Sequence, residues 1–365
     1  MHITPLVKRL KEAFLIDDFI DAGYSIEYWD LSKIYKPKVT LPDIIEESYI
    51  YRFNQLSEVR NSLSNLDVKQ SVFIIQFDKC YSCSDLFILL SRFNCTTIRI
   101  NIYPRTIQKV PINMQTWRFL IFSVSFYKLL LKYFRTILFS IFETNKKIFD
   151  YYFACNSSAT HRINAPDYDN YQKIRRNKPR RLIEEDYILF IDIYFPLHGE
   201  TTERYSNRNE ISKKYQKHMS RFFNWMEKNY KKPVVIAAHP SSDYRNKEFG
   251  NRKIIKNKTA LLVRDASLVI THASTSHIYA VLFNKPIVFI KTKEMSFKIN
   301  ILARHFNKKA YDIYSVNYSH MDFSPINEEL RVNYIYSELT SHSTKHKNNS
   351  EIILKQVDSI FEKLK

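Results

Sequence analysis

The sequence predicts an α/β protein built from two Rossmann-like lobes, and three observations support this fold class. The chain has 365 residues, which is longer than one hydrophobic core usually grows, so two domains are expected. Short apolar runs alternate with helix-like segments in both halves, as in proteins with parallel sheets. A polar stretch with two prolines and a basic run, residues 163–185, separates the two halves.

These observations set the expected domain boundaries. We predict an N-terminal lobe over residues 1–162, an interdomain linker over 163–185 and a C-terminal lobe over 186–340. Residues 341–365 form a polar segment followed by a terminal helix. In that helix Ile, Leu, Val and Phe recur at helical spacing, so we expect it to pack on a lobe.

The N-terminal lobe shows the alternation of helix and strand in outline. Apolar and β-branched residues predict strands at 25–31, 72–77 and 97–103, and the strand at 72–77 is apolar on both faces, as in a buried parallel sheet. Helical patterns cover Pro5 to Phe14 and Ser84 to Phe93. Together these elements predict a parallel α/β sheet for this lobe.

Residues 117–142 interrupt this alternation with a long stretch of Phe, Leu, Ile and Tyr that also contains regularly spaced cations. The cations, Arg118, Lys128, Lys132 and Arg135, are too many for a membrane-spanning helix. A basic amphipathic helix at a membrane surface fits the pattern, and a core helix of the lobe fits it equally well.

The C-terminal lobe has a clearer pattern than the N-terminal one. Several short runs are apolar on both faces and alternate with amphipathic segments, which predicts a second parallel sheet with covering helices. We expect strands at 187–194, 234–238, 268–271 and 286–290, and helices at 211–230, 258–266 and 275–283.

Composition limits the classes of function that fit the chain. It contains only three glycines, so neither a P-loop nor a glycine-rich dinucleotide-binding turn can be assembled. The formal net charge of +19 favours anionic partners, such as phosphorylated substrates or anionic lipid. No nucleic-acid recognition motif accompanies this charge, and we therefore expect no nucleic-acid partner.

The four cysteines, Cys80, Cys83, Cys95 and Cys155, do not complete a zinc site, because no second pair joins Cys80 and Cys83. We expect buried thiols and no bound metal. The first residues mix charges into a helical pattern and do not resemble a signal peptide. This favours a cytoplasmic location, with contact at the inner face of the cytoplasmic membrane left open.

Two polar segments follow predicted strands of the C-terminal lobe. His239, Pro240, Ser241 and Ser242 follow one strand, and His272, Ala273, Ser274, Thr275 and Ser276 follow another and open a helix. Ligands of open parallel sheets bind beyond the carboxyl ends of the strands, and a helix start with small hydroxyls can hold a phosphate. Ordinary helix capping and a structural histidine are the competing interpretations.

Other polar residues of this lobe are weaker candidates for the same site. Asp192 lies near the end of the strand predicted at 187–194 and His198 follows it, as a buried acid and a cleft residue. Arg245, Arg252 and Lys253 could offset the charge of a departing diphosphate, although cations of this kind are nearly as often solvated surface.

At these residues the sequence resembles a known family. The run from His239 to Ile290 is similar to the C-terminal lobe of bacterial surface-polysaccharide glycosyltransferases of the GT-B fold, of the polysialyltransferase-like and capsule Kdo-transferase-like kind. His239-Pro240 matches the family's His-Pro motif, and Ser274-Thr275 stands where the family has paired serines. The likeness is strongest over residues 150–295.

The resemblance implies that the C-terminal lobe binds a nucleotide-sugar donor, CMP- or UDP-linked, and that the N-terminal lobe binds the acceptor, without a bound metal or cofactor. Enzymes of this kind open with a strand and a loop, whereas this sequence starts at the helix, with His2 where the loop would lie. Either the first strand is supplied differently or the start is truncated. The candidate acid–base residues of this lobe are His2, Asp17, Asp18 and Asp78.

We therefore expect an enzyme that transfers a sugar to a surface glycan or lipid-linked glycan of the capsule or lipopolysaccharide kind. A sugar-nucleotide epimerase or a glycerophosphotransferase would need the same phosphate-binding site. A non-catalytic scaffold with the same two lobes is the alternative from a different class. Nucleotide-sugar binding separates the scaffold from the enzymes, and product analysis separates the enzymes from one another.

Overall fold

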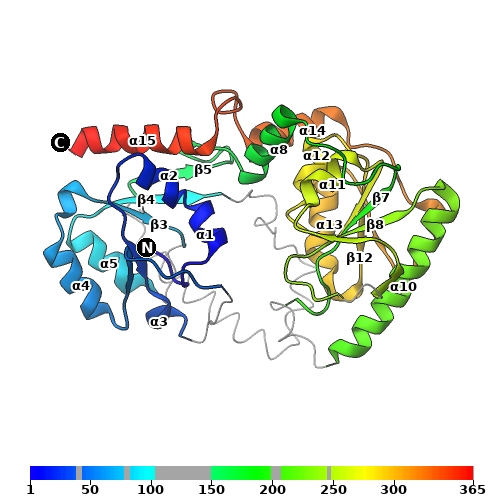
Figure 1. Cartoon of the computed structure of the whole chain (residues 1–365), viewed down its shortest axis with the longest axis horizontal. Coiled ribbons are helices and arrows are strands. Elements are labelled where there is room, and N and C mark those ends of the chain that lie inside the picture. Colours follow the sequence, from blue (N-terminus) through cyan, green and yellow to red (C-terminus); the bar gives the residue numbers. More distant parts are fainter. Residues whose placement is uncertain (38–42, 78–82, 103–148, 199–206, 245–247, 365) are drawn as a thin grey trace, which may run out of the picture. The chain divides into compact units, whose positions relative to one another are not determined.

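The computed structural model describes residues 1–37, 43–77, 83–102, 149–198, 207–244 and 248–364, which form two α/β units (Figure 1). Unit 1 contains the described residues of 1–102, 149–166 and 340–364, and unit 2 contains those of 167–339. Each unit has a parallel sheet, which confirms the predicted α/β fold class. The predicted amphipathic segment 117–142, Asp78 and Arg245 lie outside the described residues.

Unit 2 contains a six-stranded sheet in which every neighbouring pair is parallel. The order across the sheet is β10-β8-β7-β11-β12-β13. Strands β8 and β10 therefore lie on one side of β7, and β11, β12 and β13 lie on its other side. The strands are β7 (Ile188–Ile191), β8 (Val234–Ala238), β10 (Ile254–Lys256), β11 (Leu268–Thr271), β12 (Ile287–Lys291) and β13 (Ala310–Asp312), and the short β9 (Glu248–Asn251) precedes β10.

The central strands of unit 2 end at the same level. Ile191 is aligned with Ala237 on one side and with Thr271 on the other, so β7, β8 and β11 end within one residue of the same level. All residues of these three strands are buried, as their continuous Val, Ile, Leu and Phe runs predict. The residues that follow them therefore meet at one edge of the sheet.

Helix α10 (Arg208–Tyr230) covers one face of this sheet. Tyr215, Met219, Phe222 and Met226 recur at spacings of three and four, so they form one buried stripe that packs against the sheet. Burial of a side chain of this size stabilises the fold by about 2 kcal/mol. The other helices of the unit are α11 (Thr259–Asp265), α12 (His277–Leu282), α13 (Ser296–His305) and α14 (Glu328–Tyr334).

The range 163–185, predicted as an irregular linker, contains the twelve-residue helix α8 (Pro166–Asn177). Its sequence has no clear apolar period, because only two of its residues, Tyr168 and Ile174, are buried and need apolar side chains. Its ends nevertheless carry helix signals, with Pro166 at the first position, acidic residues in the first turn and basic residues in the last.

Unit 1 contains two separate sheets. Strands β1 (Tyr28–Asp30) and β2 (Ile50–Arg52) form a parallel pair, and β3 (Val72–Ile75), β4 (Thr96–Asn101), β5 (Tyr151–Ala154) and β6 (His161–Arg162) form a parallel four-stranded sheet. The preceding and connecting helices are α1 (Lys8–Ala13), α2 (Ile16–Asp21), α3 (Ser32–Tyr35), α4 (Leu56–Asn65) and α5 (Ser84–Arg92).

The first two residues of the chain lie between these sheets. His2 forms a parallel bridge with Asp30, in which the His2 N–H donates to the Trp29 carbonyl at 3.0 Å and the Leu31 N–H donates to the His2 carbonyl at 2.9 Å. The Met1 amine donates to the Ile74 carbonyl of β3 at 2.8 Å. Met1 and His2 thus occupy, over two residues, the position of a strand between β1 and β3.

The terminal helix α15 (Asn349–Leu364) packs on unit 1, where Figure 1 shows it running beside β4 and β5. Its apolar stripe, which contains Ile352, Ile353 and Val357, contacts Ile98 and Phe153 of the four-stranded sheet. None of the helices in the described ranges is long and apolar enough to span a membrane.

A buried hydrogen-bond network joins Asn164 to the polar segment before α15. The Asn164 side-chain amide donates to the carbonyls of Thr344 and Lys347, at 3.2 and 2.8 Å, and its oxygen accepts from the Thr340 hydroxyl at 2.7 Å. The backbone of Asn164 exchanges two further bonds of 2.7 Å with the Asn349 side chain. We call this network the asparagine clasp.

Candidate functional site

The candidate site of unit 2 lies at the carboxyl edge of the sheet, where the strand order reverses. Asp192 follows β7, His239 follows β8 and His272 follows β11, and these three strands are neighbours. In open parallel sheets, ligands bind in the crevice beyond such a reversal. The two polar segments singled out in the sequence therefore emerge on the same edge, one on each side of β7.

Asp192 is a buried acid at the centre of this edge, with 2% of its surface exposed. Burial raises its pKa to about 6, while the Tyr244 hydroxyl and the backbone amides of Tyr194 and His239 oppose that rise. The hydroxyl of Tyr244 donates to the carboxylate at 2.8 Å. A carboxyl group with this pKa can exchange a proton near neutral pH.

His239 heads a compact turn. Its Nδ1 accepts a hydrogen bond from the Ser241 backbone N–H at 3.1 Å, which leaves the ring proton of the neutral form on Nε2. Ser242 donates to the His239 carbonyl from both its backbone N–H and its hydroxyl, at 2.9 and 2.7 Å. The turn thus fixes the orientation of the ring, in which Nε2 is the hydrogen-bond donor. Pro240 and Ser241 are exposed.

The ring of His198 packs edge-on against that of His239, with 4.7 Å between the ring centroids. His198 is carried by the loop after β7, and its backbone N–H donates to the Tyr194 carbonyl at 2.8 Å. The structure thus brings His198, His239 and Asp192 together from two neighbouring strand ends.

His272 is fully buried. Its Nδ1 lies 2.7 Å from the Ile290 carbonyl and must donate to it, so its Nε2 accepts from the Tyr215 hydroxyl, also at 2.7 Å. Burial lowers the pKa of His272 to about 4 and keeps the ring neutral. Because both nitrogens are used inside unit 2, His272 supports the strand ends and offers no group to a ligand, contrary to what we expected from the sequence.

Ser274, Thr275 and Ser276 form a turn ahead of α12, which begins at His277, two residues later than predicted. The Ser274 hydroxyl accepts from the Ser276 N–H at 3.3 Å. The buried His277 holds the Ser274 carbonyl through Nδ1 at 2.7 Å. This bond anchors the turn to the first residue of α12. Thr275 is exposed, and Ser274 and Ser276 are partly exposed.

A cavity of about 500 Å³ adjoins this turn through Ser276. Its walls come from α8 and from the starts of α11 and α12, and they include Asp167, Asn170, Lys258, Thr259 and Tyr279. The Asn170 amide donates to the Tyr279 hydroxyl at 2.9 Å. Burial raises the pKa of the Asp167 carboxyl. The volume is in the range of small-molecule sites, and its mixed polar lining offers several donors and acceptors.

The cations near the site differ from those proposed from the sequence. Arg252 forms two hydrogen bonds with the Glu227 carboxylate, at 2.8 and 2.6 Å, and that carboxylate also accepts from the N–H of Val234, the first residue of β8. Arg252 therefore lies at the amino edge of the sheet, opposite to His239. Lys253 directly precedes β10 and is also on the amino side.

Lys256, the last residue of β10, is a cation at the carboxyl edge beside the His239 turn. Its ammonium donates to the Ser242 carbonyl at 2.6 Å, within the turn that His239 heads. Sequence reasoning missed it because Arg252, Lys253 and Lys256 are close in sequence and only the direction of β10 separates them. Its position as the last residue of an apolar strand run was the available signal.

In unit 1, the candidate bases that the structure describes, His2, Asp17 and Asp18, do not form one cluster. Burial, followed by the nearby Met1 ammonium, lowers the pKa of His2 to about 4, and its Nδ1 accepts from the Thr4 N–H at 3.2 Å. Asp17 and Asp18 lie in the first turn of α2, and exposed Asp17 pairs with Lys11 at 2.8 Å. No sequence signal pointed to Asp30, the buried residue that ends β1 and whose backbone pairs with that of His2.

Cys83, Cys95 and Cys155 are buried. Among the residues that the structure describes, no group of three or more His, Cys, Asp or Glu side chains could hold a metal ion.

Unit 2 offers a turn headed by His239, a hydroxyl-bearing turn, Lys256 and an adjoining cavity, which together suit an anionic ligand with a polar body.

No family model matches this sequence, and no curated protein matches it significantly. Among solved structures, UDP-GlcNAc 2-epimerase from Methanocaldococcus jannaschii is similar at 12% identity and a TM-score of 0.44, covering 98% of this chain and 100% of that one. A putative UDP-N-acetylglucosamine 2-epimerase from Listeria monocytogenes is similar at 10% identity and a TM-score of 0.45, covering 99% and 96%. The wall teichoic acid polymerase TagF is similar at 10% identity and a TM-score of 0.47, covering 100% and 87%.

Proposed function

We propose that this protein is a glycosyltransferase that uses a nucleotide-sugar donor bound by unit 2. The observation that carries the proposal is the strand order of unit 2, whose reversal beside β7 puts the His239 turn and the Ser274–Ser276 turn on one sheet edge. The likeness of these two segments to the His-Pro and paired-serine motifs of GT-B surface-polysaccharide glycosyltransferases supports the same assignment. The donor site then consists of His239, Ser274, Thr275 and Ser276.

The groups at this edge suit the departure of a nucleotide diphosphate. The Nε2–H of His239 would donate to a phosphate oxygen, and the hydroxyls of the Ser274–Ser276 turn would donate to others. Lys256 would add a positive charge close to the His239 turn. Donors that are already oriented stabilise the charge that develops on the leaving group without reorganising, which is how such sites accelerate transfer.

The cavity beside Ser276 would hold the nucleoside of the donor. Its volume of about 500 Å³ accommodates a base and ribose, and Asp167, Asn170 and Thr259 can bond to their polar edges. Sites that bond to such edges discriminate well between bases, because a mismatched base leaves buried groups unpaired. We therefore expect one nucleotide, of the CMP or UDP type, to bind much more tightly than the others.

Unit 1 would bind the acceptor and supply the base that removes the proton from its hydroxyl. The backbones of His2 and Asp30 pair at the end of β1, so these two residues are neighbours, and we take them as the candidate bases of the unit. A glycan or lipid-linked glycan is the expected acceptor, and the net charge of +19 would favour contact with an anionic membrane at its cytoplasmic face. No metal is needed in this scheme.

Calorimetric titration of the whole chain with UDP, CDP, CMP and their sugar derivatives tests the proposal. We expect one nucleotide series to bind, and His239→Ala to weaken it by about 10- to 100-fold, because a hydrogen bond to a charged phosphate is lost. His320→Ala is the matched control, since His320 is an exposed histidine of the same unit. Its affinity should equal that of the unaltered chain.

The nature of the product then identifies the reaction. Transfer of a sugar to an acceptor supports the glycosyltransferase. A sugar nucleotide whose sugar has the opposite configuration at one carbon would identify an epimerase. Transfer of a glycerophosphate would identify a glycerophosphotransferase. If no nucleotide binds, or if His239→Ala binds as tightly as the control, the donor site is not where we propose. The chain would then be better explained as a non-catalytic scaffold.

A further inference from the structure

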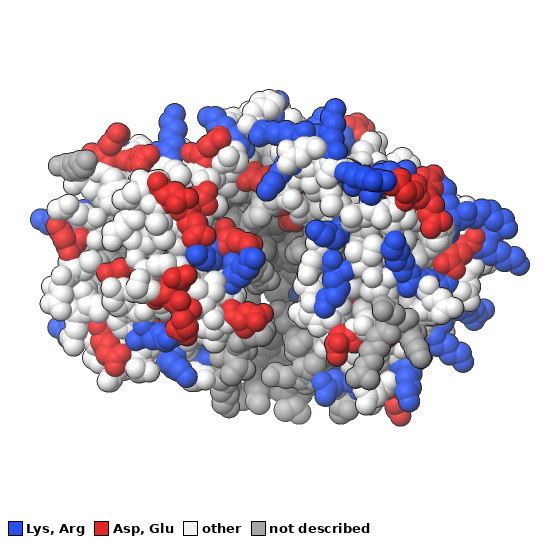
Figure 2. Space-filling view, viewed as in Figure 1, with Lys and Arg blue, Asp and Glu red and all other residues white. Residues whose placement is uncertain are grey.

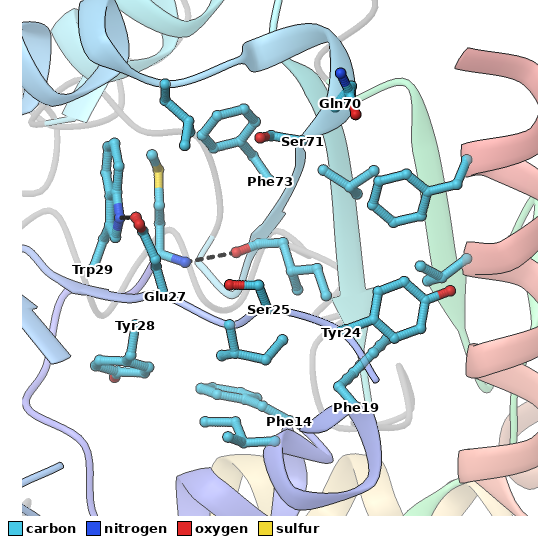
Figure 3. Close-up of a pocket in the computed structure, with 18 of the residues that line it drawn as sticks. Phe14, Phe19, Tyr24, Ser25, Glu27, Tyr28, Trp29, Gln70, Ser71 and Phe73 are labelled. Atoms are coloured by element: carbon cyan, nitrogen blue, oxygen red, sulfur yellow. Dashed lines mark hydrogen bonds between the residues drawn. The ribbon is translucent and has the colours of Figure 1, made fainter. Parts of the chain in front are cut away.

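Buried polar side chains of unit 2 connect the proposed donor turn to a distant part of the unit. They differ in this from the cavity of about 450 Å³ in unit 1, whose walls are mostly aromatic and aliphatic (Figure 3). There the Glu27 carboxylate accepts from the indole N–H of Trp29 at 2.6 Å, so the bond stays within three residues of chain. In unit 2, the bond between His277 and Tyr334 joins residues 57 positions apart.

His277, the first residue of α12, holds the proposed donor turn through two bonds to one acceptor. Its backbone N–H and its ring Nδ1 both contact the Ser274 carbonyl, at 3.2 and 2.7 Å. Because a carbonyl only accepts, Nδ1 carries the ring proton. Within the described residues, Ser276, the N-cap residue of α12, forms no side-chain capping bond. The orientation of the turn therefore depends on His277, and the Ser276 hydroxyl is not used to cap the helix.

Tyr334 fixes the other side of the His277 ring. With the proton on Nδ1, the Nε2 of His277 accepts from the Tyr334 hydroxyl at 3.2 Å. Both residues are buried, with 0% and 1% of their surface exposed. Burial lowers the pKa of His277 to about 4, so the ring stays neutral at neutral pH. Since a buried polar group without a partner is costly, the orientations of Tyr334 and of the turn are fixed together.

A second bond joins the same two helices. The Arg331 guanidinium of α14 donates to the carbonyl of Val281, near the end of α12, at 3.3 Å. Helix α12 is thus bonded to α14 near both of its ends, through His277 and through Val281. Bonded and packed side chains of this kind carry energetic coupling between sites. A displacement of the donor turn is therefore transmitted to α14.

The chain changes its helical form directly after Tyr334. Helix α14 ends there, and residues Ile335–Leu339 form a π-helix. Such turns are rare, and they occur frequently at functional sites. Leu339 is the last residue of unit 2, and the next residue, Thr340, donates to Asn164 in the asparagine clasp of unit 1 at 2.7 Å. The π-helix is thus held at one end by the His277–Tyr334 pair and at the other by the clasp.

We propose that His277 and Tyr334 are positioning residues of the donor site, which couple an anion bound at the Ser274–Ser276 turn to the order of the π-helix 335–339. The inference rests on the proposed function, because it takes this turn as the site of the donor phosphates. A phosphate bound by the hydroxyls of the turn favours a Ser274 carbonyl directed towards His277, away from the negative charge. Anion binding and the His277–Tyr334 bond therefore stabilise each other, and by linkage to the same extent.

Tyr334→Phe tests the pair, since it removes one hydroxyl and leaves the ring in place. Calorimetry well below the unfolding midpoint, with UDP, CDP and CMP as probes, should show affinity reduced by about five- to tenfold for the nucleotide that binds. Without nucleotide, hydrogen exchange at the amides of Ser276 and His277 should quicken by about threefold or more. Tyr230→Phe, at an exposed position of α10, is the matched control and should change neither quantity.

Hydrogen exchange in the presence of nucleotide measures the coupling itself. The nucleotide that binds should slow exchange at the amides of residues 335–339 by about threefold or more in the unaltered chain and in Tyr230→Phe. In Tyr334→Phe this response should be largely lost. A merely structural role of Tyr334 would lower the unfolding midpoint of unit 2 but would leave the response of these amides to nucleotide in place.

A double variant tests whether the two side chains act through one bond. His277→Asn keeps an amide that can donate to the Ser274 carbonyl but loses the acceptor for Tyr334. The double variant His277→Asn/Tyr334→Phe should therefore bind nucleotide no more weakly than His277→Asn alone, because both changes break the same bond. Losses of affinity that simply add would contradict the proposal.

Two further results would overturn it. One is a Tyr334→Phe chain that binds nucleotide as tightly as Tyr230→Phe does, and the other is a bound nucleotide that leaves exchange at residues 335–339 unchanged in the unaltered chain. Either result, together with binding that His239→Ala weakens, rejects this inference and leaves the proposed function in place. If the unaltered chain binds none of the three nucleotides, the proposed function fails, and the inference fails with it.

Discussion

The two units of this protein have the same type of sheet but complete it differently. Unit 2 has one sheet of six parallel strands, whereas unit 1 has a two-stranded and a four-stranded sheet, and Met1 and His2 form backbone hydrogen bonds to both. Among the described residues, unit 2 is one stretch of sequence, whereas unit 1 is assembled from three stretches, and the asparagine clasp joins two of them. A contiguous unit has its packing partners nearby in sequence, while unit 1 depends on contacts between distant residues.

The charges on the two units differ as well. On the face drawn in Figure 2, Lys and Arg side chains predominate over unit 2, while acidic and basic side chains are mixed over unit 1. A surface of one sign raises the local concentration of ligands of the opposite sign. This difference agrees with the assignment of the anionic donor to unit 2 and of the acceptor to unit 1.

The largest effect that would sharpen this comparison is expected from Asn164→Ala. The substitution removes three buried side-chain hydrogen bonds of the clasp, so unit 1 should lose about 3 kcal/mol of unfolding free energy. Scanning calorimetry should show the unit 1 transition moving down while that of unit 2 stays in place. Asn229→Ala, at an exposed position of α10, is the control. A single transition that moves as a whole would show that the units do not unfold independently.

The next effect is acid sensitivity of unit 2. His272 and His277 are buried, and their pKa values are lowered to about 4. Their neutral forms therefore stabilise unit 2 fully at a pH above about 6.5, the pKa of a histidine in the unfolded chain. This stability is lost as the pH falls from about 6.5 to 4, by about 3 kcal/mol for each histidine. Asp192 has the opposite effect, because its raised pKa favours the protonated folded form as the pH falls below about 6.

Asp192→Asn separates these contributions. It removes the opposing contribution of the carboxyl group, so unit 2 should lose stability more steeply on acidification than the unaltered unit does. Chemical denaturation at pH 7, 6, 5 and 4 measures the slopes. Equal slopes for the two proteins would mean that Asp192 titrates normally in the folded unit.

The smallest effect is expected from Tyr244→Phe. The hydroxyl of Tyr244 donates to Asp192, and its loss should cost unit 2 about 1 kcal/mol and raise the pKa of Asp192 further, because the bond favours the carboxylate. Titration of Asp192 by NMR measures the pKa. Tyr318→Phe, at a half-buried position of the same unit, should leave it unchanged. A lowered pKa in Tyr244→Phe would show that other groups hold the carboxylate.

The sequence predicted the strands of unit 2 well for a physical reason. Val234–Ala238 and Leu268–Thr271 are short runs buried on both faces, and such runs have few alternatives to a central strand. Helix α8 was missed because its burial is slight and its signals lie at its ends. The place of Met1 and His2 could not be predicted, since two residues form no pattern and their partners, Asp30 and Ile74, are distant in sequence.

In the candidate site, too, some residues could be placed from the sequence and others could not. The positions of His239 and of the Ser274–Ser276 turn follow from strand direction, because residues after parallel strands meet at one edge. The partners of the buried groups, Tyr215 for His272 and Tyr244 for Asp192, come from elsewhere in the unit and leave no trace in the local sequence. Arg252 was assigned to the wrong edge because its place before β10 was not recognised.

The discontinuity of unit 1 also bears on how the protein is made. A nascent chain emerges from the ribosome from its amino end at about 5–20 residues per second, and domains fold as they become complete. Unit 2 is whole once residue 339 has emerged, whereas the sheet residues Ile98, Ile100 and Phe153 await the covering helix α15, which is made after unit 2. The four-stranded sheet of unit 1 is thus made before unit 2 but covered after it, and it is where a chaperone would be needed most.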